Sequence, residues 1–134
     1  MFALALLWWF QRRSRTFTYA QLVALARETG FPDPFLAAAV AMAESGIPHS
    51  KPQVANAFAH GDILRGHSLG LWQINLRAHP EFAPFALYDP NYNAQAALKV
   101  SNRGTNWKPW STFNSGAYKV FMPAKPATAS EPTA

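Results

Sequence analysis

The chain of 134 residues is 49% hydrophobic and 14% aromatic. This length accommodates one domain with short tails, and the composition excludes an intrinsically disordered chain. The absence of cysteine excludes disulfides, thiolate metal sites and cysteine nucleophiles. The formal net charge of +5 indicates attraction to polyanions. The basic residues are scattered apart from a cluster at 12–15 and lie in no nucleic-acid-binding motif, so we expect no specific nucleic acid partner.

Residues 1–15 form an apolar run that ends in a basic cluster. The run is half the length of about 20 residues that a membrane-spanning helix needs, and it lacks the order of charges and the cleavage site of a secretory signal. Two alternatives are open: an anchor in a membrane interface or a virion protein, with Trp8 and Trp9 at the surface, or a helix packed on its own domain. We expect a domain over 16–122 and a flexible tail rich in Pro, Ala and Thr over 123–134.

Local capping signals predict helices. The segment Thr18–Gln21 has the form of a capping box, and Gly30 is a stop signal. Two Asp-Pro pairs, at 33–34 and 89–90, place a cap before a proline at the first helical position. The expected helices cover residues 19–29, 35–45, 91–102 and 111–121.

The stretch 47–70 is rich in Pro, His, Asn, Gly and Ser and predicts irregular chain with at most short strands. Compact domains usually keep such long loops for function, so we expect this one to face a substrate. In the apolar run Ser68–Asn75 that follows, Gly70 marks a close approach of another backbone or a ligand. The run itself is compatible with helix or strand.

Glu44 is the carboxylate that local structure explains least among the seven acidic residues, because Asp33 and Asp89 are accounted for as helix caps. It follows Leu36 and Val40 at helical spacing and therefore lies at the edge of the inward face. Partial desolvation there raises the pKa of a carboxyl group, as a glycosidic general acid requires. The alternative is an exposed carboxylate at the end of a helix.

The segments Ala43–Gly46, Ser68–Asn75, Leu87–Ala94 and Phe113–Gly116 resemble, in order, motifs of the soluble lytic transglycosylase family. These motifs are a Glu-Ser pair, Gly-Leu-Met-Gln-Ile, an asparagine on a following helix, and Ala-Tyr-Asn-Ala-Gly. Each is weak alone, but their joint occurrence in this order is specific. The resemblance covers about 35–122 and implies a mainly α, α+β lysozyme-like fold: a single helical domain whose small irregular or β insertion forms one wall of a substrate groove.

This resemblance implies that Glu44 protonates the glycosidic oxygen between N-acetylmuramic acid and N-acetylglucosamine in peptidoglycan glycan strands. Glu44 then acts as base while the muramyl 6-hydroxyl closes on the anomeric carbon, which gives a 1,6-anhydromuramyl product. Because an internal hydroxyl attacks, no second carboxylate is needed. We expect no cofactor, and no metal site either, since the four histidines lack the spacing of metal ligands.

The family motifs also imply a substrate-binding set. Trp72 replaces the usual methionine and either stacks on a sugar or lies in the core, whereas Phe113 replaces a tyrosine and lacks its hydroxyl. Tyr118 cannot be assumed to replace that hydroxyl. The expected substrate-binding residues are Ser45, Ser68, Gly70, Leu71, Trp72, Gln73, Ile74, Asn93, Phe113, Asn114 and Tyr118.

Two rival functions are open. In a hydrolytic lysozyme, Asp62 would be a second carboxylate that positions an attacking water, although it is equally explained as a turn residue. A wall-binding or virion structural module without turnover would keep the groove. The small size and the basic, Trp-bearing head indicate a virion-associated bacteriophage enzyme, held near a membrane, that opens the bacterial cell wall from the periplasmic side during entry.

Overall fold

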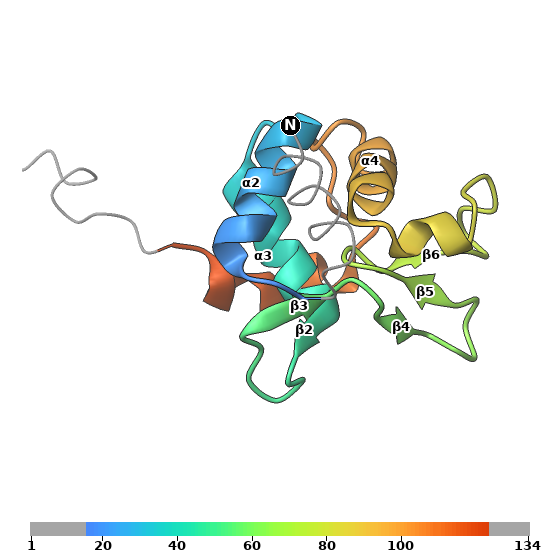
Figure 1. The fold of residues 1–134 in the computed structure, drawn as a ribbon, viewed down its shortest axis with the longest axis horizontal. Helices are drawn as coiled ribbons and strands as arrows, with labels where there is room; N and C mark the ends of the chain where they lie inside the picture. Colours follow the sequence, from blue (N-terminus) through green and yellow to red (C-terminus); the bar gives the residue numbers. More distant parts are fainter. Residues whose placement is uncertain (1–15, 124–134) are drawn as a thin grey trace, which may run out of the picture.

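A computed structural model of the protein describes residues 16–123 as helices stacked beside two small antiparallel sheets (Figure 1). The expectations for the anchor over 1–15 and for the tail beyond Pro123 lie outside these residues. Among the described helices, none combines the length and apolar character that crossing a membrane requires.

The predicted caps start the three longest helices: α2 (Tyr19–Thr29), α3 (Pro34–Ser45) and α4 (Pro90–Val100). Both hydrogen bonds of the capping box join Thr18 and Gln21, at 2.9 and 3.2 Å. The carboxylates of the Asp-Pro pairs accept from the amides of Leu36 and Tyr92 at 3.1 and 3.0 Å. These helix starts are confirmed because capping depends on bonds within one turn of chain.

α3 is the central element, packed between α2, the first sheet and the C-terminal segment. Its alanines at 37–39 and 41 are fully buried, and their small side chains let neighbouring backbones approach closely. Leu22 and Ala26 of α2 are equally buried in the core. α3 is therefore held by packing on several sides, which fixes the position of the residues at its C-terminal end.

The irregular stretch forms short strands, as predicted. The first sheet joins β1 (Thr16–Phe17), β3 (Val54–Asn56) and β2 (Gly46–Ile47) in that order. The second joins β4 (His60–Gly61), β5 (Ser68–Leu69) and β6 (Ile74–Asn75), with Leu69 opposite Ile74. The run left open as helix or strand is thus a hairpin, and Figure 1 shows the second sheet on the side of the molecule away from α2.

The prediction of one continuous last helix over 111–121 is wrong. It is divided into α5 (Ser111–Asn114) and the 3-10 helix η2 (Ala117–Phe121), because Gly116 takes a left-handed φ of 83° that no α-helix continues through. α4 likewise ends at Val100 rather than Asn102, since Asn102 has a φ of 51°. A further 3-10 helix, η1 (Phe85–Tyr88), precedes α4.

Candidate active site

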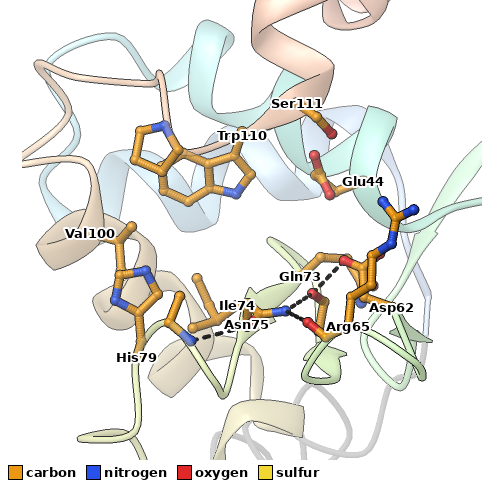
Figure 2. A pocket seen from close by; sticks show the side chains of 13 residues that line it. Glu44, Asp62, Arg65, Gln73, Ile74, Asn75, His79, Val100, Trp110 and Ser111 are labelled. Carbon is orange, nitrogen blue, oxygen red and sulfur yellow. Dashed lines mark hydrogen bonds between the residues drawn. The ribbon is translucent and has the colours of Figure 1, made fainter.

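A cleft of about 480 Å³ separates the C-terminal end of α3 from the second sheet (Figure 2). One wall comes from α3 and the start of α5, and the other comes from the β5–β6 hairpin and the loop between β4 and β5. The residues that line it are Glu44, Asp62, Arg65, Ser68, Gln73, Ile74, Asn75, Ala78, His79, Val100, Pro109, Trp110 and Ser111. The cleft therefore brings together distant parts of the sequence.

Glu44 points into this cleft from the last turn of α3 (Figure 2). The hydroxyl of Thr112 donates a hydrogen bond to its Oε2 over 2.6 Å. Burial raises the pKa of Glu44 above its ordinary value. The side-chain and backbone hydrogen bonds from Thr112 lower it, and the negative charge of Asp62 raises it further. The net upward shift suits a group that must hold a proton until it meets a substrate.

Asp62 lies in the opposite wall and combines the two properties that the sequence left as alternatives. Its backbone oxygen accepts from the amides of Arg65 and His67 at 2.8 and 2.9 Å, which defines a turn. Its Oδ2 accepts from the hydroxyl of Ser68 at 2.7 Å, and the side chain lines the cleft. The φ of 49° is one that Asp tolerates better than most residues. A second carboxylate thus faces the cleft from the wall opposite Glu44.

The hairpin contributes Ser68, Gln73 and Ile74 to the cleft lining. Ser68 and Ile74 are each only 2% exposed, so Gln73 is the one of the three with a substantially exposed side chain. The amide nitrogen of Gln73 is directed at the carbonyls of Ala59 and Gly70, each at 3.0 Å, so it also holds the hairpin in shape. Asn75, which the sequence did not single out, donates to the Ser68 hydroxyl at 3.2 Å. This wall is a connected polar network.

Direct sugar contact by Trp72 does not fit the structure, because its side chain is 0% exposed and its Nε1 donates to the carbonyl of Ala37 at 2.9 Å. The alternative of a core tryptophan is confirmed. Leu71 is also 0% exposed, and Gly70 is buried, so neither contacts a substrate directly. Residues 70–72 of this motif therefore pack beneath the cleft and do not form its surface.

Asn93 is likewise fully buried and cannot touch a substrate. Its Nδ2 donates to the carbonyls of Leu69 and Leu87, both at 2.9 Å, and its Oδ1 accepts from the amide of Trp72 at 2.8 Å. A Cβ on Gly70 would collide with this side chain. Asn93 therefore shapes the groove from below, by tying the hairpin to α4.

The other expected substrate-binding residues lie outside the cleft lining. Ser45 is 4% exposed, and its hydroxyl donates to the carbonyl of Ala41 within α3, so a bond to a sugar does not fit. Phe113 and Tyr118 stack on each other with ring centres 4.9 Å apart. Asn114 donates to the carbonyl of Lys108 at 2.8 Å. None of these three residues lines the cleft.

Sequence reasoning missed Thr112, Trp110, Arg65 and His79. The contacts of Thr112 and Trp110 span 68 and 38 residues, which no local pattern reveals. The available signal was their closeness to the Phe113–Gly116 motif, which Thr112 directly precedes and Trp110 precedes by three residues. Across residues 16–123, no three His, Asp or Glu side chains gather in a way that could hold a metal ion.

A helical body with a small antiparallel sheet across a cleft from a part-buried glutamate defines a lysozyme-like fold. The SLT_3 family model, described as a lysozyme-like domain, matches residues 15–112, and the chain belongs to this family. The family indicates an enzyme that cleaves glycosidic bonds of peptidoglycan. The Phe113–Gly116 segment lies just beyond the match. No curated protein and no solved structure matches the chain.

Proposed function

We propose that the protein is a lytic transglycosylase that cleaves the bond between N-acetylmuramic acid and N-acetylglucosamine and forms a 1,6-anhydromuramyl end. The observation that carries this proposal is Glu44, a part-buried carboxylate of raised pKa that points into a cleft of sugar-binding size. A single carboxylate in this setting suffices when the attacking hydroxyl belongs to the substrate.

The reaction uses Glu44 twice. Its protonated carboxyl gives the proton to the glycosidic oxygen as the bond from that oxygen to the anomeric carbon breaks. The resulting carboxylate takes the proton of the muramyl 6-hydroxyl, whose oxygen forms the new bond to the anomeric carbon. Glu44 ends protonated, as it began, and no water is consumed.

Hydrolysis is the second candidate function, and the placement of Asp62 favours it. Asp62 lines the same cleft and its charge acts on Glu44. A carboxylate across a cleft from the acid is the arrangement in which an inverting glycosidase holds a water. Against this role, the Oδ2 atom of Asp62 already accepts the Ser68 hydroxyl.

Mass spectrometry of digested peptidoglycan distinguishes these functions. Purified glycan strands are incubated with the protein in water enriched in heavy oxygen. We expect muropeptides that end in anhydromuramic acid, lighter than reducing ends by one water and free of the label. Labelled reducing ends without anhydro forms would establish hydrolysis, and intact strands would indicate a module without turnover.

We also propose that the enzyme opens the cell wall locally during bacteriophage entry, as part of the virion, with residues 1–15 as its anchor. The support is the apolar run with two tryptophans and a basic end, a pattern typical of interfacial segments. Flotation with lipid vesicles compares the full chain with residues 16–134. Equal flotation of both forms would remove the membrane anchor from this proposal.

A further inference from the structure

Thr112 makes the hydrogen bond that fixes the Glu44 carboxylate. Its hydroxyl donates to Oε2 over 2.6 Å. It is the second residue of α5, directly before Phe113, which stands where the related motif has a tyrosine. The hydroxyl that Phe113 lacks is thus present one residue earlier in the chain.

We propose that Thr112 is the positioning residue that supplies this missing hydroxyl to Glu44, and that it leaves Oε1 as the oxygen that carries the catalytic proton. The inference rests on the proposed function for its catalytic meaning. The contact between the two side chains stands independently of that function.

The oxygen assignment follows from the chemistry of the pair. A threonine hydroxyl has a single hydrogen, and here it is directed at Oε2. An oxygen that accepts a short hydrogen bond has less electron density to offer a second proton. Oε1 accepts no hydrogen bond from the Thr112 side chain, and it is the oxygen to which we assign the catalytic proton.

Neither neighbouring aromatic residue takes this role. Phe113 has no hydrogen-bonding atom, and its ring lies stacked on Tyr118 at an interplanar angle of 17°. Neither ring lines the cleft. Among residues 16–123, the side-chain hydrogen bond of Glu44 is the one from Thr112.

The core holds Thr112 in place. Trp110, just before α5, is 4% exposed and donates its Nε1 hydrogen to the carbonyl of Trp72 at 2.8 Å. A residue whose chain is fixed two positions away has little freedom to swing from Glu44. The hydrogen bond is therefore preorganised, which is the property a positioning residue needs.

The test compares Thr112→Val, which keeps the shape and removes the hydroxyl, with Thr112→Ser, which keeps the hydroxyl. Thr29→Val is the matched control, because the Thr29 hydroxyl donates to the carbonyl of Leu25 within α2 and does not contact the cleft. Two readouts are used: the pH profile of kcat on peptidoglycan, and the titration of the Glu44 carboxyl carbon by NMR.

We expect Thr112→Val to lower kcat by roughly 10- to 100-fold, the range for losing a hydrogen bond to a charged group. Loss of the donor also raises the pKa of Glu44, so the basic limb of the pH profile moves to higher pH. Thr112→Ser restores both properties and Thr29→Val changes neither. If Thr112→Val does not fold, Thr112→Ala removes the same hydroxyl without a branched side chain.

The inference is overturned if the hydroxyl-free variants lose activity equally at every pH and the Glu44 titration does not move, because Thr112 would then have a structural role alone. Failure of the proposed function has a different signature. In that case the wild-type protein does not cleave peptidoglycan, while the NMR titration still reports whether Thr112 sets the state of Glu44.

Discussion

The indole nitrogen of Trp110 donates a hydrogen bond of 2.8 Å to the backbone oxygen of Trp72. The indole nitrogen of Trp72 in turn donates to the carbonyl of Ala37, on the helix whose last turn carries Glu44. Two indole groups therefore join α3, the β5–β6 hairpin and the chain that enters α5. These are the segments that form the walls of the cleft, so its shape depends on bonds that no substrate touches.

Trp110→Phe tests this connection, since it keeps an aromatic ring and removes the donor. The carbonyl of Trp72 is then left buried without its partner, at a cost of about 1–3 kcal/mol. We expect the melting temperature to fall by roughly 5–15 °C in a thermal scan. Trp107→Phe is the control, because Trp107 is equally buried at 4% exposure and packs by ring stacking. Equal losses in both variants would show that ring size, not the indole bond, matters.

Asn93→Ala should be more damaging still. It removes three hydrogen bonds from a fully buried site, two to carbonyls and one from a backbone amide. We expect a loss of at least about 3 kcal/mol in the free energy of unfolding, measured by urea denaturation. Asn91→Ala, at an exposed position of the same helix, should be close to neutral. Similar values for the two variants would contradict the role of Asn93 as a tie.

The helices were predictable because their starts depend on neighbouring residues. Thr18 with Gln21 and the two Asp-Pro pairs each satisfy amides within one turn, which a sequence displays directly. The break at Gly116 was not visible, because a glycine there is compatible with a helix until tertiary packing selects its left-handed conformation.

The place of Glu44 in the cleft was predictable, but its surroundings were not. The motifs identified Glu44, whose burial agrees with the expected direction of its pKa. They also included Trp72 and Asn93, which the structure buries under the cleft. A sequence motif does not show whether its residues pack in the core or contact a substrate. The bond from Thr112 joins residues 68 positions apart and appears only once the chain is folded.

Glu44→Gln should abolish cleavage, with kcat reduced by at least about 100-fold, since the amide cannot give a proton to the leaving oxygen. Release of muropeptides from purified peptidoglycan measures this, with circular dichroism as the check on folding. Glu28→Gln, an exposed position of α2, is the control and should retain full activity. Wall clearance by Glu44→Gln at the wild-type rate would remove Glu44 from the mechanism.

The same substitution should stabilise the fold at neutral pH. Because burial raises the pKa of Glu44, the folded state holds the proton more tightly than the unfolded state. Stability is therefore greatest below the unfolded pKa of about 4.3 and is lost as pH rises through the folded pKa. We expect Glu44→Gln to melt above wild type at pH 7, with the difference shrinking towards pH 4. A constant difference across this range would contradict the desolvation of Glu44.

Asp62→Asn distinguishes an electrostatic neighbour of Glu44 from a residue that holds a nucleophilic water. Asparagine accepts the Ser68 hydroxyl as well and tolerates the left-handed φ of 49°, so the turn should survive. Removing the negative charge lowers the pKa of Glu44, because that charge contributes to raising it. The basic limb of the pH profile therefore moves to lower pH, opposite to the shift expected for Thr112→Val.

Under the proposed function, Asp62→Asn keeps kcat at its optimum within about tenfold of wild type, because the muramyl hydroxyl needs no second carboxylate. Its products still end in anhydromuramic acid. If Asp62 instead held the attacking water, the variant would lose turnover by several orders of magnitude and wild type would yield reducing ends. Measuring rate and product mass together on the same digests decides between an internal hydroxyl and a water, because only a nucleophilic water makes both quantities depend on Asp62.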